Sequence, residues 1–289
     1  MDWTSPPTST AKPIIPDIIS AGQIVSLVGQ GAVGKSLLIF EIAMALATGR
    51  SVLGYPPADP IRVLYIDMEN PVGEVYKRRL DLGYGDDSLE GLTYYHMPNV
   101  PPLDTQPGGK FIEALAERHS ADLLILDTIS KLVEGEESKA DTWQDLYKYS
   151  MIPLRREDRA VLILDHQGHD DTRGARGSSA KRDNVDLQWI QKRQGEVITL
   201  RRDKCRTLHD VELLKIRRGG TPLRHVIERD PVQHCCDVLD KLGADQGIGR
   251  DKARDLLGNN GYQFPVQVIN AALKQRKAAV QSDPVRNAA

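Results

Sequence analysis

The chain has 289 residues, of which 40% are hydrophobic and 27% are charged, a composition typical of a folded globular protein. This length accommodates one large domain, or a large domain with a small one. The 38 Lys and Arg residues nearly balance the 40 Asp and Glu residues, so the net charge of −2 excludes a polybasic nucleic-acid binder but not a local basic track. Aromatic residues make up only 5%, which argues against a base-stacking platform.

The sequence shows no membrane or targeting signal. No apolar run reaches the roughly 18 residues that a transmembrane helix needs, and the first residues lack the basic and then apolar order of a signal peptide. The three cysteines, Cys205, Cys235 and Cys236, form no C-x-x-C pair, which favours a reducing compartment. We therefore expect a cytoplasmic protein with no membrane partner.

From Gly22 onward, apolar strands alternate with amphipathic helices. Strands are expected at 24–28, 62–67, 92–97, 122–127 and 160–166, and helices at 37–48, 72–83, 109–119 and 141–156. This alternation predicts βαβ units and a mostly parallel sheet. Residues 1–17 are rich in Pro, Ser and Thr and are expected to form a flexible arm that becomes ordered near Ile14–Ile19.

After residue 186 the pattern changes to hairpins and then to short helices. Strand pairs at 187–193 with 196–202 and at 211–218 with 223–229 flank glycine turns, and are expected to extend one edge of the sheet as antiparallel hairpins. Three short helices follow, at 232–242, 248–257 and 265–278, and the last two also fit a helix-turn-helix. The predicted organisation is a large α/β domain over 18–230 and a small helical or winged-helix unit over 231–289.

Residues 29–36, GQGAVGKS, form a complete G-x-x-x-x-G-K-[ST] P-loop between a predicted strand and a predicted helix. Glycines let such a loop wrap phosphates, and its backbone N–H groups and the helix N-terminus then face them. We expect ATP to be held by Gly29, Gln30, Gly31, Ala32, Val33, Gly34, Lys35, Ser36 and Leu37. Within this set, Lys35 is expected to reach the β- and γ-phosphates and Ser36 to bind Mg²⁺.

Magnesium in a P-loop site also needs a carboxylate at the end of a neighbouring strand. Asp127, at the end of the strand 122–127, fits that position. Thr128 follows it, whereas ATPases of the AAA+ kind normally place a catalytic glutamate there. The group that activates water is therefore expected at a different strand end.

Glu69, just past the strand 62–67, is the candidate for that group, and Asp67 is a weaker alternative. The carboxyl ends of parallel strands lie at one edge of a sheet, where ligands bind. Glu69 and Asp127 are therefore expected to converge with the P-loop and with His166, which ends the strand 160–166.

Four segments resemble a known family: GQGAVGKS (29–36), YIDMEN (65–70), LLILDT (123–128) and LILDHQ (162–167). They are similar to RecA-like ATPases, in particular the RepA/DnaB-type branch of hexameric replicative helicases. The resemblance spans residues 14–228 and implies a RecA-like P-loop core. It also implies that Glu69 is the catalytic carboxylate and that His166 or Gln167 senses the γ-phosphate.

The resemblance extends to two basic elements. RGARGSSAKRDNVD (173–186) is similar to the segment that follows the sensor strand in RepA-type helicases, where an arginine at the position of Arg176 reaches into the neighbouring subunit's site. LRRDKCRTL (200–208) resembles the K-x-R element of DnaB-type proteins, usually K-N-R or K-Q-R followed by glycine, and Lys204 and Arg206 match its cations. Such cations stabilise the charge of the transition state. They imply a ring, usually a homo-hexamer with active sites at subunit interfaces.

A basic stretch interrupts the otherwise balanced charge of the chain. Residues 168–206 contain ten Lys and Arg against six Asp and Glu. The loop 168–183 is expected to contact single-stranded DNA through Arg173, Lys181 and Arg182, mainly by electrostatic attraction to phosphates. The alternative is that this loop serves only contacts between subunits.

The motifs and the resemblance together predict a RecA-like DNA helicase or translocase that uses ATP and Mg²⁺. It would act in phage or plasmid replication, with a separate primase or initiator protein as a partner. Two alternatives stay open. One is a RecA/RadA-type recombination or repair ATPase that forms filaments, and the other is a nucleotide-switched loader or regulatory module without motor activity.

Overall fold

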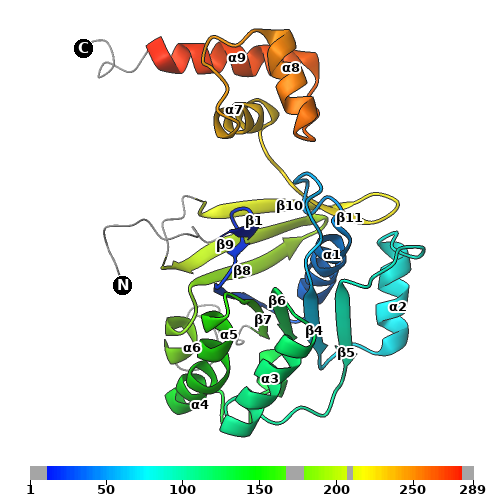
Figure 1. The fold of residues 1–289 in the computed structure, drawn as a ribbon, viewed down its shortest axis with the longest axis vertical. Helices are drawn as coiled ribbons and strands as arrows, with labels where there is room; N and C mark the ends of the chain where they lie inside the picture. Colours follow the sequence, from blue (N-terminus) through cyan, green and yellow to red (C-terminus); the bar gives the residue numbers. More distant parts are fainter. Residues whose placement is uncertain (1–11, 167–178, 207–210, 282–289) are drawn as a thin grey trace. The chain divides into compact units, whose positions relative to one another are not determined.

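The computed structural model describes residues 12–166, 179–206 and 211–281 (Figure 1). The chain divides into two compact units, one of residues Met1–Gly54 and Ala58–Val226 and the other of Tyr55–Pro57 and Ile227–Ala289. The large unit thus ends a few residues before the expected boundary at 230. The small unit also includes a segment that follows the first long helix, which the sequence pattern did not indicate.

Within the described residues, a nine-stranded sheet forms the centre of the large unit, in the order β11-β10-β9-β8-β3-β7-β6-β4-β5. The parallel strands are β3 (Ile24–Gly29), β4 (Val63–Asp67), β5 (Leu92–His96), β6 (Leu123–Asp127), β7 (Ala160–His166) and β8 (Leu187–Gln194). The sheet continues through β9 (Val197–Cys205), β10 (Leu213–Gly219) and β11 (Arg224–Ile227), and β9 is antiparallel to β8 and β10. The mostly parallel sheet and its added hairpin strands confirm the predicted α/β fold with a RecA-like core.

Helices cover both faces of the sheet (Figure 1). On one face, Phe40 of α1 (Lys35–Thr48) meets the Tyr65 ring edge to face. On the other face, the core joins the sheet to α3 (Gln106–Arg118), α4 (Ala140–Leu146) and α5 (Ile152–Arg156). A π-helical turn, Tyr147–Met151, connects α4 to α5, so the expected single helix at 141–156 is continuous but contains a bulge. The remaining helix of this region, α2 (Val72–Asp81), buries none of its residues.

The central strands are buried on both faces. Every residue of β3, β4 and β6 is buried, which explains their nearly continuous apolar sequences. Three aspartates break this pattern close to the carboxyl ends of their strands: Asp67, Asp127 and Asp165, all at most 1% exposed. Buried carboxylates need hydrogen-bond or charge partners, so these positions mark an edge where polar groups gather.

The segment before β3 differs from the expected flexible arm over 1–17. Residues 1–11 lie outside the described part of the chain, but Pro13–Ile15 (β1) pairs with Ile19–Ser20 (β2) in a small antiparallel sheet. Ile15 and Ile18 are buried. This strand pair agrees with the order expected near Ile14–Ile19, but the boundary of the arm at residue 17 is wrong, because the isoleucines among the prolines provide apolar surface that is already buried from Ile15 onward.

The small unit is helical. The helices α7 (Pro231–Lys241), α8 (Arg250–Asn259) and α9 (Val266–Gln281) pack around Cys235, Leu239, Leu257, Ile269 and Ala272. Residues 228–281 contain no strand, so the helical alternative holds and this segment has no wing. Arg276 of α9 is 3% exposed and donates to Asp240 at 2.7 Å. This arginine therefore stabilises the unit, and it is not available for reading DNA.

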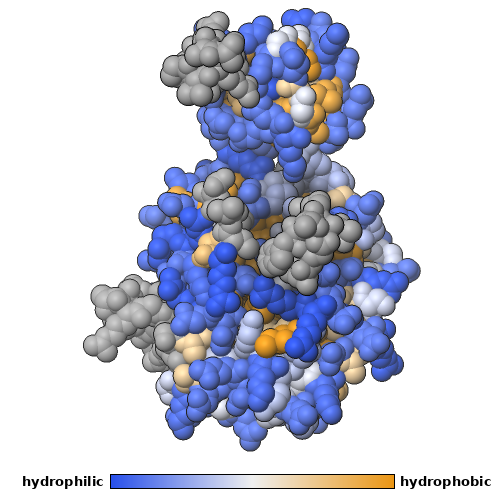
Figure 2. Space-filling model, turned by 60° about the vertical axis from the view of Figure 1, so that its left-hand side comes forward, coloured by the Kyte–Doolittle hydropathy of each residue, from blue (hydrophilic) through white to orange (hydrophobic). Residues whose placement is uncertain are grey.

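The surface is mostly hydrophilic, with small, separated hydrophobic patches on the face that Figure 2 shows. Exposed apolar side chains include Val72, Tyr76 and Leu80, which follow one another at intervals of four residues along α2. Among the helices of the described ranges, none combines the length and the apolarity needed to cross a bilayer.

Candidate nucleotide-binding site

The P-loop connects β3 to α1, and two of its glycines have clear structural reasons. Gly34 has a φ of 90°, a left-handed conformation that is strained for any residue with a side chain. A Cβ atom on Gly29 would lie 2.8 Å from the backbone oxygen of Gln191 on β8. Only glycine at position 29 therefore lets β3 and β8 approach as closely as they do.

Lys35 begins α1, and its side chain folds back over the loop. Its Nζ donates to the carbonyl oxygens of Gly29 at 2.8 Å and Gln30 at 2.9 Å. Burial lowers the pKa of the Lys35 ammonium, while the carboxylates of Asp127 and Glu69 oppose that shift. A phosphate is a stronger partner for an ammonium than a carbonyl, so the group is placed to exchange these contacts for a nucleotide.

Asp127 ends β6 and is 1% exposed. Its carboxylate accepts hydrogen bonds from the Ser36 hydroxyl and from the Tyr65 hydroxyl, the latter at 2.7 Å. Burial raises the pKa of Asp127 to about 6, against the lowering effect of both hydrogen bonds. A hydroxyl and a carboxylate in contact form the donor set with which P-loop proteins hold Mg²⁺, the other ligands being phosphate and water. Ser36 and Asp127 therefore fit the expected ion.

No cluster of three or more His, Cys, Asp or Glu side chains suited to a metal occurs in the part of the chain that the structure describes. Magnesium usually binds proteins through one or two carboxylates together with substrate phosphates. The ion expected here would therefore bind together with the nucleotide.

Glu69 and His166 meet at the carboxyl edge of the sheet. Nε2 of His166 lies 3.1 Å from Oε1 of Glu69, although 97 positions separate the two residues in the chain. Nζ of Lys131 lies 3.9 Å from the same oxygen. The Glu69 side chain is 27% exposed, so water has access to the carboxylate. The structure thus brings the predicted base next to the predicted phosphate sensor.

Asp67, the weaker alternative to Glu69, is fully buried and has other partners. Its Oδ1 accepts hydrogen bonds from the backbone N–H groups of Glu69 at 2.8 Å and Asn70 at 3.0 Å. Its Oδ2 accepts a hydrogen bond from the Tyr94 hydroxyl. Asp67 therefore fixes the turn that carries Glu69, and its carboxylate has no access to water.

A cleft of about 470 Å³ runs along this edge of the sheet, a size within the range of roughly 300–1,000 Å³ for small-molecule sites. It is lined by Ala32, Gly34, Lys35, Ser36, Leu37, Glu69, Asn70, Asp127, Thr128 and His166, together with Glu74, Lys77, Arg78 and Asp81 of α2, and Arg218 and Leu223. The other predicted nucleotide contacts, Gly29, Gln30, Gly31 and Val33, belong to the same loop without lining the cleft.

Arg218 of β10 is a cleft residue that no local motif indicates. Burial, and then repulsion from Arg193 and Arg78, lowers the pKa of its guanidinium. Arg193 itself lies beside the P-loop, since a Cβ on Gly34 would be 3.6 Å from its Nη1. No carboxylate of the described residues pairs with the Arg218 side chain. An unpaired guanidinium among other cations favours an anionic ligand.

Lys204 and Arg206 lie at the edge of the sheet opposite the P-loop. Because β9 runs antiparallel to β8, Lys204 pairs with Gln188 near the start of β8. Nζ of Lys204 donates at 2.7 and 2.8 Å to the last carbonyls of α6 (Ser179–Asp183), and Arg206 binds the final carbonyl of this helix. Both cations therefore hold the end of a helix within their own chain.

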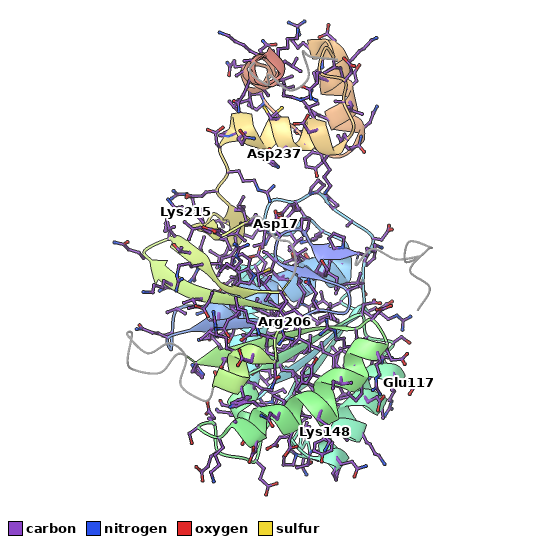
Figure 3. All side chains as sticks on the ribbon, turned by 90° about the vertical axis from the view of Figure 1, so that its left-hand side faces the viewer. Asp17, Glu117, Lys148, Arg206, Lys215 and Asp237 are labelled. Carbon is purple, nitrogen blue, oxygen red and sulfur yellow. The ribbon has the colours of Figure 1, made fainter. Side chains whose placement is uncertain are left out.

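The K-x-R spacing occurs again on β10, at Lys215 and Arg217, with Gly219 two positions later. Leu214 and Ile216 alternate with these cations and are buried, so Lys215 and Arg217 project from the exposed face of the strand. Figure 3 labels Lys215 and Arg206 at well-separated places on the large unit, and Arg206 follows the last residue of β9. Gly219 is the sequence signal that favours Lys215 and Arg217 over Lys204 and Arg206 as the match to the K-x-R element.

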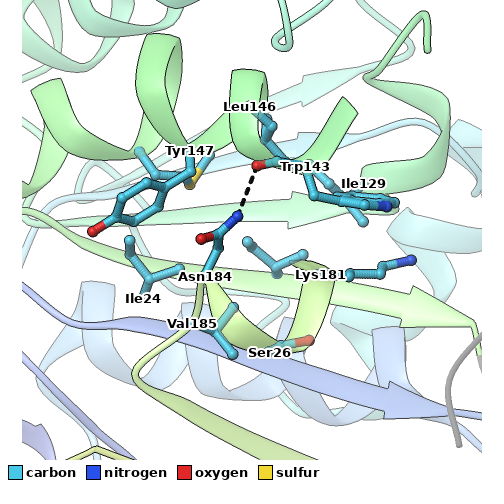
Figure 4. A pocket seen from close by; sticks show the side chains of 11 residues that line it. Ile24, Ser26, Ile129, Trp143, Leu146, Tyr147, Lys181, Asn184 and Val185 are labelled. Carbon is cyan, nitrogen blue, oxygen red and sulfur yellow. Dashed lines mark hydrogen bonds between the residues drawn. The ribbon is translucent and has the colours of Figure 1, made fainter. Parts of the chain in front are cut away.

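Lys181, one of the expected DNA contacts, is enclosed by other side chains. Its ammonium pairs with Asp165 and lies 3.4 Å from Glu137. It also sits 4.2 Å from the centre of the Trp143 ring, and Figure 4 shows these last two side chains, Lys181 and Trp143. The Lys181 side chain is 10% exposed and that of Asp165 is 1% exposed. The expectation of a phosphate contact is therefore corrected, because this charge neutralises a buried carboxylate.

The other predicted basic contacts fall into two groups. Arg182 is half exposed and pairs with Asp203 at 2.7 Å, so it keeps access to solvent. Gln167, Arg173 and Arg176 lie outside the described residues.

A comparison with known protein families supports the same site. The family described as AAA domain matches residues 1–172, which is more than half of the chain. The chain belongs to the AAA domain family. The match extends from the N-terminus past β7, so it includes the P-loop, Glu69, Asp127 and His166. No curated protein matches the chain.

Membership of the AAA domain family makes this chain a P-loop ATPase domain that binds nucleotide. Within this AAA domain, Thr128 still stands where AAA+ enzymes carry a catalytic glutamate, and its hydroxyl donates to the Leu164 carbonyl at 2.8 Å. Another carboxylate, that of Glu69, lines the cleft two residues past the end of β4.

Replacing Lys181 should destabilise the AAA domain far more than replacing its neighbour. Lys181→Ala leaves the Asp165 carboxylate buried without a counter-charge, and should cost about 3–5 kcal/mol of unfolding free energy in urea titrations. Arg182→Ala, at an exposed pair, should cost about 1 kcal/mol or less.

The loss of unfolding free energy in Lys181→Ala, called the deficit below, should depend on pH in a defined direction. Burial already raises the pKa of Asp165, and removal of the ammonium raises it further. The deficit is therefore full while Asp165 is ionised in the variant, and it should shrink as the pH falls through the raised pKa of this carboxyl. Equal losses of unfolding free energy in Lys181→Ala and Arg182→Ala would contradict the buried-pair interpretation. Weaker DNA binding by Lys181→Ala at unchanged stability would restore the interpretation that Lys181 contacts phosphate.

Removing the charge of Arg218 should weaken nucleotide binding by the AAA domain. Arg218→Gln takes away an unpaired cation in the cleft, and the affinity for a fluorescent ATP or ADP analogue should fall by about ten-fold. Arg254→Gln, on the exposed surface of α8, is the matched control and should bind as the wild type does. An unchanged affinity in Arg218→Gln would mean that the guanidinium does not contact the ligand.

Proposed function

We propose that this AAA domain ATPase is a RecA-like DNA helicase or translocase of the RepA/DnaB type, acting in phage or plasmid replication. The contact between Glu69 and His166 is the observation that carries the proposal. It links the carboxylate that would activate water to the end of β7, and His166 is followed directly by the segment 167–178. A residue at this junction can couple the state of the nucleotide to the segment proposed to contact DNA.

The residues at the cleft have complementary roles in the proposed hydrolysis of ATP. Lys35 binds the β- and γ-phosphates, and Glu69 accepts a proton from the attacking water. Ser36 and Asp127 would hold Mg²⁺, which would supply positive charge to the phosphate oxygens when bound. His166 can exchange its hydrogen bond to Glu69 for one to a γ-phosphate oxygen, so its position depends on whether ATP or ADP is bound.

We further propose that the chain assembles into a homo-hexamer with active sites at subunit interfaces. Lys215 and Arg217 supply the cations for the neighbouring subunit in place of Lys204 and Arg206, whose side chains bind α6 in their own chain. The β10 cations are exposed near the edge of the sheet that carries the P-loop, which supports this role. Arg176 stays a second candidate for the trans-acting arginine.

Single-stranded DNA is the proposed polymer partner, contacted through Arg173 and the solvent-exposed Arg182. A separate primase or initiator protein would complete the replication machinery. The local surplus of positive charge between β7 and β9 supports an electrostatic, sequence-tolerant contact.

The ATPase assignment predicts different effects for two substitutions. Glu69→Gln should retain nucleotide binding and lose ATP hydrolysis by about 10²–10⁴-fold, because the amide cannot accept the proton. Lys35→Ala should lose both nucleotide binding and hydrolysis. Full hydrolysis by either variant, measured as phosphate release, would contradict the assigned roles.

The motor assignment is tested by adding single-stranded DNA at low salt and by measuring the mass of the assembly. ATP hydrolysis should rise with DNA, and a hexamer mass should appear with nucleotide. A filament on DNA in electron micrographs would favour the RecA/RadA-type alternative. Absence of both stimulation and strand displacement would favour the nucleotide-switched module.

Mixing two inactive variants tests the trans-acting cations. Lys35→Ala removes the P-loop function of its own site, whereas Arg217→Gln should remove the cation from the neighbour's site. In a ring with head-to-tail interfaces, an equimolar mixture should regain about a quarter of the wild-type activity, because one interface in four pairs an intact P-loop with an intact cation. Activity that stays at the level of the separate variants would exclude Arg217 from this role.

A further inference from the structure

We propose that Tyr65 and Tyr94 are positioning residues of the ATPase site, Tyr65 acting on the metal-binding carboxylate of Asp127 and Tyr94 acting through Asp67 on Glu69. This inference rests on the roles proposed above for Asp127 and Glu69. Neither tyrosine lines the cleft, so each would act through another residue.

The sheet register places these groups on one face. Tyr65 and Asp67 are two positions apart on β4, so their side chains point to the same side. Tyr65 lies beside Tyr94 of the neighbouring strand β5, and Asp67 lies beside Asp127 of β6, the neighbour on the other side. The four side chains therefore form a compact group beneath the carboxyl edge, with both carboxylates closer to the cleft than the two rings.

Each tyrosine donates to one carboxylate. The Tyr65 hydroxyl donates to Oδ2 of Asp127 at 2.7 Å, and the Tyr94 hydroxyl donates to Oδ2 of Asp67. The two rings stack with their centroids 4.8 Å apart. Phe40 of the P-loop helix packs edge to face against both rings, at 6.3 and 5.6 Å. The rings thus have little freedom, and their hydroxyl groups have fixed positions.

The two hydrogen bonds lead to different parts of the chemistry. With Oδ2 held by Tyr65, rotation of the Asp127 carboxylate is restricted, so the carboxylate keeps a fixed orientation beside the Ser36 hydroxyl. On the other branch, Asp67 holds the backbone N–H groups of Glu69 and Asn70, and Tyr94 holds Asp67 in place. Loss of the first hydroxyl should impair metal binding, whereas loss of the second should impair the activation of water.

The test replaces each hydroxyl in the full-length protein, as Tyr65→Phe and Tyr94→Phe. Phenylalanine keeps the ring and its packing against Phe40, so both variants should fold, which thermal unfolding can verify. The readouts are Mn²⁺ affinity of the nucleotide complex by electron paramagnetic resonance, nucleotide affinity in EDTA, and kcat with saturating Mg²⁺.

Tyr65→Phe should weaken Mn²⁺ binding by about ten-fold, with nucleotide affinity in EDTA unchanged. Tyr94→Phe should lower kcat by about ten-fold and leave Mn²⁺ affinity unchanged. Tyr95→Phe is the matched control, because Tyr95 is the next residue on β5, points to the opposite face and bonds to His119 at 2.9 Å. This control should change neither readout.

Wild-type Mn²⁺ affinity in Tyr65→Phe, or wild-type kcat in Tyr94→Phe, would overturn the inference, and so would equal losses in all three variants. Failure of the proposed function has a different signature. Wild-type protein whose nucleotide complex binds no Mn²⁺ would contradict the role of Asp127. Wild-type protein that binds nucleotide and Mn²⁺ but does not hydrolyse ATP would contradict the role of Glu69, and either result would remove the basis of the inference.

Discussion

Parallel pairing of β3, β7, β6 and β4 is the constraint on which the site depends. Because these strands run in one direction, the P-loop and the last residues of three other strands meet at one edge. The insertion of β7 between β3 and β6 brings His166 within reach of Glu69 and leaves room for a nucleotide beside Asp127. The same arrangement brings the Glu69 carboxylate, just past the end of β4, into the cleft that contains Asp127.

The cost of burying charge explains much of the remaining arrangement. Asp67, Asp127 and Asp165 end or nearly end strands that are otherwise apolar, and each has a dedicated donor. Tyrosine hydroxyls serve the two carboxylates nearest the catalytic position, and the Lys181 ammonium serves the third. Among the residues that the structure describes, Arg218 has no such partner, and this contrast separates groups that are satisfied within the fold from a group suited to an incoming anion.

The sequence alone predicts the parts of the site that depend on local order. The P-loop, Asp127 and Glu69 follow from strand ends and a contiguous motif, and the order of helices and strands follows from their periodicity. The basic residues are different, because Lys181, Lys204 and Arg206 have partners on other elements that no local pattern reveals. Arg218 reaches the cleft only because β10 joins the far side of the sheet, and a tertiary arrangement of that kind has no signature within ten or so neighbouring residues.

The close approach of β3 and β8 at Gly29 has an evolutionary consequence. The first glycine of the motif is required by the backbone of a neighbouring strand, whether or not a nucleotide is bound. Selection for catalysis and selection for folding therefore act on the same position. In a descendant that had lost its ATPase activity, substitutions of Lys35 and Ser36 would be tolerated, whereas Gly29 would still be retained because the fold requires it.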